Sequence, residues 1–423
     1  MNLKQSNRWL VLFCLVFAGE MIFSLPFHVT RFFRPTFLEV FQFTNGELGD
    51  VFAIYGIAAM LAYFPGGAIA DHFSARKLMA LSLTATAVGG VFMAQIPGFW
   101  GMGLIYAYFG VTSILLFWAA LIKATREWGG PMKQGSAFGI LDGGRGLVAA
   151  AMASIAVWIL SLLMPDNVDT LSALERTTAL QAVIYFYAFV TLLAAVLIWF
   201  FLPNTHHDRV IRVPVWQGIS QVIRKPVIWM QAIIIICAYS AYKSLDNYAL
   251  YAQSAFGMNE LEASAFATLG AYLRPVAAVA TGFVVDRYVA SRVIAVFFAV
   301  LILSYSLLSF LSMATFGAIL LYANIVVSFV AVYGIRGVYF ALIEETHIDK
   351  KLTGTAVGLI SVIGFMPEIF FASVAGRLLD ASPGIAGHQN IFLMLAGFSV
   401  VGIVATVLLV FFKRKSRVTE HGG

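Results

Sequence analysis

Two stretches of this chain repeat one another: GAIADHFSARK at residues 67–77 and GFVVDRYVASR at residues 282–292. In each stretch a glycine precedes an aspartate by four residues and a basic residue follows it by six, and the two aspartates lie 215 residues apart. A second pair, GSAFGIL at 135–141 and GTAVGLI at 354–360, is offset by 219 residues. Both offsets are close to half of the 423-residue chain, so we expect two successive halves in the same orientation.

The composition indicates an integral membrane protein. Hydrophobic residues make up 61% of the chain and charged residues 11%, with a mean hydropathy of +0.87, whereas soluble proteins carry roughly 25% charged residues. The two cysteines, Cys14 and Cys237, lie in apolar runs, which excludes a disulfide framework and a zinc cluster. The sequence contains neither a phosphate-binding loop nor a metalloprotease motif, so we predict no ATP-driven pump, no enzyme and no cofactor.

Twelve stretches around these repeats are long and apolar enough to cross a bilayer as helices. They lie at about 8–30, 47–70, 78–97, 99–123, 135–162, 179–203, 226–253, 261–285, 292–313, 315–343, 353–378 and 389–412. The first is too long for a signal peptide and contains Glu20, so we expect a retained helix. We predict an all-α membrane fold in two parallel six-helix repeats. Its parts are an N-terminal half at 1–203, a cytoplasmic linker at 204–225, a C-terminal half at 226–412 and a cytoplasmic tail at 413–423.

Basic residues indicate the orientation in the membrane. Of the 27 lysines and arginines, 19 fall on the side of the N-terminus, three on the opposite side and five inside spans. Such an excess marks the cytoplasmic side, so both termini are expected in the cytoplasm. This distribution explains the pI of about 9.2 without nucleic acid as a partner. The bilayer is the expected environment, and we predict a monomer.

The glycine–aspartate loops after the second and eighth spans resemble those of the major facilitator superfamily. Five further stretches resemble the YihN-like bacterial inner-membrane transporters, a resemblance that fixes no substrate: Ile96–Trp100, Phe109–Thr112, Ala120–Lys123, Asp142–Gly146 and Pro383–Gly387. The resemblance implies the family's twelve-helix fold, a secondary transporter and a bacterial inner-membrane location. The first loop departs from the family pattern, because His72 replaces the customary basic residue and Ser74 replaces a common glycine.

The resemblance also implies a conformational latch at the cytoplasmic ends of the helices. Its residues would be Gly67, Asp71, Arg76, Lys77, Gly282, Asp286, Arg287 and Arg292. Asp71 and Asp286 would engage basic residues and a neighbouring helix N-terminus, where an anion is stabilised. The alternative is that these are solvated turn residues that only orient the protein.

Ionisable residues occur at membrane depth, where each costs at least ~2.5 kcal/mol and is by default functional. They are the cations Arg145, Lys243, Arg274, Arg336 and Arg377 and the anions Glu20, Asp142, Asp246 and Glu368. A spacing of three residues predicts local pairs between Asp142 and Arg145 and between Lys243 and Asp246, either structural or functional. Arg377 lies near a helix end, where its long side chain can reach the interface.

Arg274 and Arg336 have no acidic residue at such a spacing. Guanidinium groups bind carboxylate, phosphate or sulfonate through two hydrogen bonds. We therefore predict a substrate-binding group made of Arg274, Arg336, Arg31 and Lys243. The alternative is that Arg274 and Arg336 pair with Glu20 or Glu368 across the bundle.

One face of the first span is polar, with residues spaced by four, four and three: Glu20, Ser24, His28 and Arg31. Pro26 is expected to kink this helix. Arg31 and Arg34 lie at the predicted external mouth, where cations would attract an anion, although we expect ordinary solvation for Arg34.

Glu20 and Glu368 are the carboxylates best placed for proton coupling. A carboxylate removed from water can hold a proton near neutral pH, whereas an opposing arginine would keep it ionised. We leave open whether each is a proton carrier or an arginine partner. Asp142, Arg145 and Asp246 belong to the same predicted group of coupling or charge-pairing residues.

Together these observations predict a secondary active transporter that moves a small organic anion across the membrane by alternating access, coupled to protons as in a symporter. A sugar acid, sugar phosphate, sulfonate or carboxylate would fit. Within transport, the alternative is an exporter of amphipathic or lipid-like compounds. A sensor would need a larger cytoplasmic domain than the linker, and a channel would need repeated filter sequences, which the chain lacks.

Overall fold

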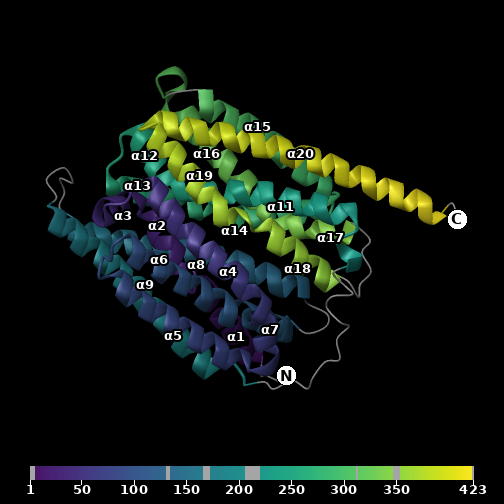
Figure 1. The fold of residues 1–423 in the computed structure, drawn as a ribbon, viewed down its shortest axis with the longest axis horizontal. Helices are drawn as coiled ribbons and strands as arrows, with labels where there is room; N and C mark the ends of the chain where they lie inside the picture. Colours follow the sequence, from purple (N-terminus) through teal and green to yellow (C-terminus); the bar gives the residue numbers. More distant parts are fainter. Residues whose placement is uncertain are drawn as a thin grey trace. The chain divides into compact units, whose positions relative to one another are not determined.

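The computed structural model describes residues 5–129, 134–164, 172–204, 220–310, 313–345 and 353–421. Most of these residues lie in helices, and no strand occurs within those ranges (Figure 1). This confirms the predicted all-α class. Residues 205–219 of the predicted linker lie outside the described residues.

The chain divides into two compact units, and the first contains residues 1–209, 246–275 and 372–380. Its helices are α1 (Gln5–Met21), α2 (Val29–Phe32), α3 (Arg34–Phe41), α4 (Asn45–His72), α5 (Ala75–Met93), α6 (Phe99–Val111), α7 (Ala119–Gly129), α8 (Gln134–Leu163), α9 (Ala173–Phe201), α12 (Tyr248–Phe256) and α13 (Glu260–Ala271). π-Helical turns at Ser24–His28 and Thr112–Trp118 connect α1 to α2 and α6 to α7.

The second unit contains residues 210–245, 276–371 and 381–423. Its helices are α11 (Pro226–Ser244), α15 (Ala290–Phe310), α16 (Met313–Val338), α17 (Leu342–Glu345), α18 (Thr353–Gly364) and α20 (Ile385–His421). Two further helices, α14 (Leu273–Val285) and α19 (Pro367–Ala381), contribute residues to both units. Neighbouring pairs such as α5 with α9, and α15 with α20, pack along their length (Figure 1).

Among the described residues, ten helical segments are long and apolar enough to cross a membrane, and eleven if the bent first helix counts as one span. The remaining predicted span corresponds to α5, a helix of 19 residues. Its polar side chains lower its hydropathy, but they form hydrogen bonds with other residues of the first unit. Ser82 Oγ donates to the carbonyl oxygen of Thr112 at 2.6 Å, and the Thr86 and Thr112 hydroxyls lie 2.8 Å apart.

The first span bends by 43° between Arg8–Met21 and Ser24–Phe32, as predicted from Pro26. Proline has no N–H to donate to the preceding turn, so the regular ladder is interrupted. A π-helical turn at Ser24–His28 bridges the break. This bend brings Glu20 and His28 together, although they lie eight residues apart in sequence.

Several helices begin where the sequence supplies a capping box, in which two side chains satisfy N–H groups of the first turn. The pairs are Thr44 with Glu47 before α4, Ser172 with Glu175 before α9, and Asn259 with Glu262 before α13. Ser74, which departs from the family pattern, is the N-cap of α5 and accepts a hydrogen bond from the Lys77 N–H at 3.4 Å.

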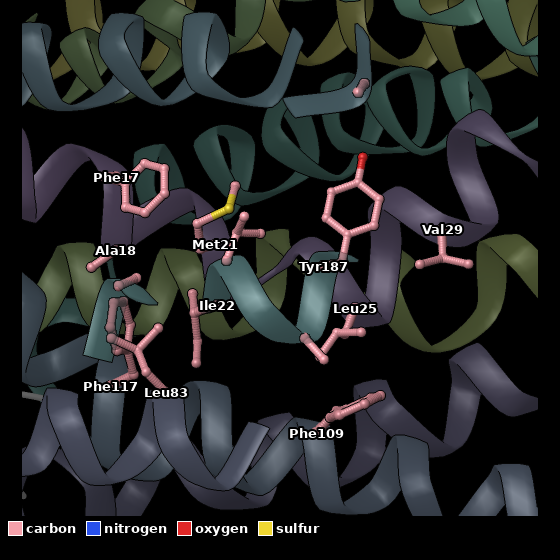
Figure 2. Close-up of a cluster of buried hydrophobic side chains, with 14 of the residues drawn as sticks. Phe17, Ala18, Met21, Ile22, Leu25, Val29, Leu83, Phe109, Phe117 and Tyr187 are labelled. Carbon is pink, nitrogen blue, oxygen red and sulfur yellow. The ribbon is translucent and has the colours of Figure 1, made fainter. Parts of the chain in front are cut away.

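The bent first helix lies in the core of the first unit. Figure 2 shows its apolar side chains, including Met21, Ile22 and Leu25, facing Phe109 of α6 and Tyr187 of α9. All five side chains are fully buried. Glu20, Ser24 and His28 of this bent helix are buried as well, so they are surrounded by protein rather than by lipid or water.

Two segments of the predicted C-terminal half pack within the first unit, and ion pairs hold them there. Residues 246–275 are attached by Arg31 Nε to Asp246 Oδ1 at 2.5 Å and by Arg176 Nε to Glu260 Oε1 at 2.8 Å. Residues 372–380 are attached through α4.

Candidate transport site

A buried ionic network in the first unit is centred on Glu20 of α1. Arg145 Nε of α8 lies 3.0 Å from Glu20 Oε2, and Arg274 Nη1 of α14 lies 3.3 Å from Glu20 Oε1. The side chains of Glu20, Arg145 and Arg274 are 4%, 9% and 6% exposed. Of the two alternatives for Arg274, the structure therefore shows pairing with Glu20.

Two further groups belong to the network around Glu20. Asp142 Oδ1 accepts a hydrogen bond from Arg274 Nη2 at 3.1 Å, and His28 Nε2 lies 3.2 Å from Glu20 Oε1. Spacing predicted that Asp142 would neutralise Arg145 within α8, but Asp142 binds Arg274 of α14 and Arg145 binds Glu20 of α1. The tertiary fold thus distributes two arginines over two carboxylates from different helices.

Small and aromatic residues shape the space for the two guanidinium groups. A Cβ atom added to Gly146 of α8 would lie 3.0 Å from the Arg274 side chain. A larger residue at position 146 would therefore crowd Arg274. The Arg145 guanidinium lies 5.4 Å from the Phe23 ring centroid and 5.7 Å from that of Trp118. Cation–π contacts of this kind stabilise a desolvated arginine.

A second ionic cluster lies in the second unit. Glu368 of α19 accepts hydrogen bonds from the Tyr239 hydroxyl at 2.5 Å and from Lys243 Nζ at 3.2 Å, both on α11. The Lys243 side chain is 2% exposed. On α16, the Arg336 guanidinium lies 3.8 Å from the ring centroid of Tyr242. We call Tyr239, Tyr242, Lys243, Arg336 and Glu368 the α11 cluster.

Lys243 and Asp246, which were predicted to pair with one another, also have partners on other helices. Lys243 binds Glu368 in the second unit, whereas Asp246 binds Arg31 in the first. Arg31 therefore has a buried carboxylate partner at the predicted external mouth.

The expectation that Arg34 is solvated is wrong. Only 2% of Arg34 is exposed, and its Nη2 donates to Asn45 Oδ1 at 3.1 Å. Burial lowers the pKa of Arg34 to about 10, so it remains a cation at neutral pH. Its neighbours in α3 are apolar, which removes the side chain from water, and the start of α4 supplies the acceptor.

The family follows from a comparison of the whole chain. A model of the Major Facilitator Superfamily matches residues 9–372. The chain belongs to this superfamily. The resemblance predicted from the two loops is confirmed, and the protein is a transporter rather than an enzyme.

Full-length relatives of this superfamily member are bacterial inner membrane proteins. Inner membrane protein YqcE of Escherichia coli (strain K12) is 27% identical over 434 aligned residues, which cover 98% of this chain and 97% of YqcE. Inner membrane protein YihN of the same strain is also 27% identical, with 96% of each chain covered. The relatives and the many apolar helices agree with the predicted membrane location.

Solved structures of other transporters share the fold of this superfamily member. The nucleoside transporter NupG has a TM-score of 0.70 at 18% identity, covering 97% of this chain and 99% of NupG. A bacterial homologue of the human lysosomal transporter Spinster has a TM-score of 0.72 at 13% identity, covering 97% and 98%. At these identities the likeness concerns the fold.

The superfamily loops form helix ends in this protein. Gly67 and Asp71 lie within α4, and the Asp71 side chain is outside the part that the structure describes. Arg76 lies 5.3 Å from the Trp199 ring centroid, and Lys77 is exposed. The remaining predicted latch residues in the second loop are half-buried Gly282 and exposed Asp286, Arg287 and Arg292.

A carboxylate missed by sequence reasoning occupies the N-terminus of α15. Glu345 of α17 accepts hydrogen bonds from the Ser291 N–H at 3.0 Å and the Ser291 hydroxyl at 2.9 Å. Lys413 Nζ of α20 lies 3.1 Å from the same carboxylate. The signal in the sequence was an acidic pair at 344–345 directly after an apolar span. The resemblance assigned this role of anion at a helix end to Asp286.

Replacing Glu345 with glutamine is expected to destabilise the protein by about 1 kcal/mol, because the α15 N-terminus loses an anionic cap. Asp286→Asn, which changes an exposed carboxylate, should leave stability unchanged. Thermal unfolding of both purified variants in detergent measures the difference. A larger loss in Asp286→Asn than in Glu345→Gln would favour the latch that the resemblance implies.

Proposed function

We propose that this transporter moves a small organic anion by alternating access, and that the α11 cluster binds the anion. The observation that supports this is that the cluster contains two cations, Lys243 and Arg336, beside tyrosine side chains. Lys243 Nζ lies 3.2 Å from Glu368 Oε1, and the Arg336 guanidinium lies 3.8 Å from the Tyr242 ring centroid. Ammonium and guanidinium groups bind carboxylate, phosphate and sulfonate through charge-assisted hydrogen bonds.

In the network around Glu20, each arginine binds a carboxylate. Its two arginines, Arg145 and Arg274, meet two carboxylates, Glu20 and Asp142. We therefore assign this network to the integrity of the first unit, and we assign substrate binding to Lys243 and Arg336.

Proton coupling would act through Glu368. An anion that binds Lys243 competes with Glu368 for the same ammonium group, which is 3.2 Å from Oε1. A proton added to Glu368 removes that competition, so substrate and proton would bind together. Tyr239 already donates to Oε2 and can keep its hydrogen bond to the neutral acid.

A ligand panel tests this proposal. Purified protein in detergent is mixed with sugar acids, sugar phosphates, sulfonates, carboxylates, neutral sugars, nucleosides and lipid-like amphiphiles at two pH values. A ligand at 100 times its dissociation constant stabilises the folded state by about 2.7 kcal/mol. We expect a thermal shift with one class of anion, larger at the lower pH.

Arg336→Gln should weaken that anion's binding about tenfold or more, because a hydrogen bond to a charged group contributes about 1.5–3 kcal/mol. Arg224→Gln, which changes an exposed arginine just before α11, is the matched control and should bind normally. Thermal shifts with neutral or lipid-like compounds alone would contradict the anion proposal and favour the exporter alternative.

A further inference from the structure

Aromatic rings lie beside the cations of the α11 cluster. The ring centroids of Tyr239 and Tyr242 lie 5.7 Å apart on α11, and the Arg336 guanidinium of α16 packs on the Tyr242 ring. The Tyr239 ring also contacts Phe365, between α18 and α19, with 4.9 Å between the centroids. The cations proposed to bind the anion therefore have flat apolar faces as neighbours.

These rings differ in how much of their surface is accessible. Tyr242 is buried, whereas Tyr239 and Phe365 are half-buried. Phe340, in the turn after α16, is half-buried as well, and its ring centroid lies 6.4 Å from that of Phe365. We call Tyr239, Phe340 and Phe365 the ring surface. Lys243 itself is only 2% exposed, so most of the accessible surface beside its ammonium group is aromatic.

Glu368 indicates where the acid group of a ligand would lie. Its two carboxylate oxygens accept hydrogen bonds from the Tyr239 hydroxyl at 2.5 Å and from Lys243 Nζ at 3.2 Å. An anion that replaces this carboxylate at Lys243 lies beside the Tyr239 side chain, and the body of the ligand then meets the ring surface. A ring can pack on another ring face to face or edge to face, whereas an open chain covers little of it.

We propose that the substrate is a cyclic anion, whose sugar or aromatic ring lies next to its acid group and packs on the ring surface. The inference rests on the proposed binding of an anion at the α11 cluster and narrows its class. Sugar acids and sugar phosphates in their ring forms and aromatic acids fit, whereas open-chain acids do not. Ligand sites commonly combine aromatic side chains with a few charged groups that fix the orientation of the ligand.

Matched ligands that differ in the ring test this proposal. The pairs are glucuronate with gluconate, a hexose phosphate with the corresponding hexitol phosphate, and benzoate with hexanoate. In each pair the first ligand is cyclic and the second is an open chain with the same acid group. Dissociation constants are measured by thermal-shift titration of the full-length protein in detergent. We expect the cyclic member of at least one pair to bind about tenfold more tightly.

Phe365→Leu should reduce this preference while retaining apolar volume. The cyclic ligand should lose about fivefold in affinity and its open-chain partner almost nothing. A general structural defect would weaken both ligands equally, so the ratio of the two dissociation constants isolates the ring contact. Phe340→Leu should lower the ratio in the same direction, and Phe365→Tyr, which keeps the ring, should preserve it.

Phe370→Leu is the matched control. Phe370 is also half-buried and lies on α19, but its ring packs against Phe398 of α20, 6.4 Å away between centroids. This variant should keep the ratio of the unmodified protein.

Equal binding of both members of every pair, or tighter binding of the open chains, would overturn the proposal and leave the anion proposal standing. An unchanged ratio in both Phe365→Leu and Phe340→Leu would also overturn it. Glucose and sorbitol form a neutral pair that separates the two proposals. Binding of glucose without binding of any anion would retain the ring contact and reject the anionic class, and no binding in any pair would reject both.

Discussion

Replacing Glu20 with glutamine is expected to abolish transport and to cost about 3–5 kcal/mol of stability, the usual effect of removing one partner from a buried ion pair. The carboxylate is shared by Arg145 at 3.0 Å and Arg274 at 3.3 Å, and all three side chains are less than 10% exposed. A neutral amide would remove the carboxylate that these two buried guanidinium groups share, whereas the contact between Asp142 and Arg274 would remain.

Thermal unfolding and the yield of folded protein measure this effect. Glu39→Gln, an exposed glutamate of α3, is the matched control and should behave as the unmodified protein. Adding Arg145→Gln to Glu20→Gln removes one of the two cations that Glu20 binds. The double variant should therefore lose less stability than the sum of the two single losses, by about 0.5–3 kcal/mol. Strictly additive losses would show that Arg145 and Glu20 do not stabilise one another.

The second large effect is expected at Lys243. Lys243→Gln removes the cation that binds Glu368 at 3.2 Å and leaves that carboxylate in a poorly solvated position, 12% exposed. We expect a loss of about 3–5 kcal/mol of stability, together with loss of transport. Neutralising both residues in Lys243→Gln/Glu368→Gln should restore most of the stability. The side chain at position 368 then has no charge that requires the Lys243 ammonium group.

Transport distinguishes a binding role from a structural one. If Lys243 binds substrate, the double variant is folded and inactive, with no thermal shift for the anion that stabilises the unmodified protein. Arg224→Gln, an exposed basic residue just before α11, should retain both properties. Recovery of transport along with stability would mean that Lys243 and Glu368 serve only as a structural pair.

Charge partners were the part of the site that sequence spacing predicted least well. Asp142 and Arg145 lie three residues apart, as do Lys243 and Asp246, yet all four bind charged residues from other helices. Glu20 and Arg274 lie 254 positions apart in the chain. Spacing along one helix defines which residues share a face, but it contains no information about which other helix that face meets.

The role of helix ends was predicted only in part. The two glycine–aspartate loops predicted carboxylates bound at helix N-termini. The structure shows carboxylates bound at the N-termini of α15 and α4. They are Glu345 and Asp380, which the motifs did not indicate, and the latch role of Asp71 and Asp286 stays a prediction. Glu345 and Asp380 come from helices remote in sequence from the ends that they bind, so local motifs could not reveal them.

By itself, the sequence determined the membrane class, the helical fold, the two-fold repeat and the bend at Pro26, because each depends on the length, hydropathy or chemistry of a local segment. Only the tertiary structure decided which buried charges neutralise one another and which aromatic rings lie beside the cations of the α11 cluster. An apolar span satisfies the membrane whatever its neighbours are, whereas a buried charge is stabilised only by the particular partner that packing brings within reach.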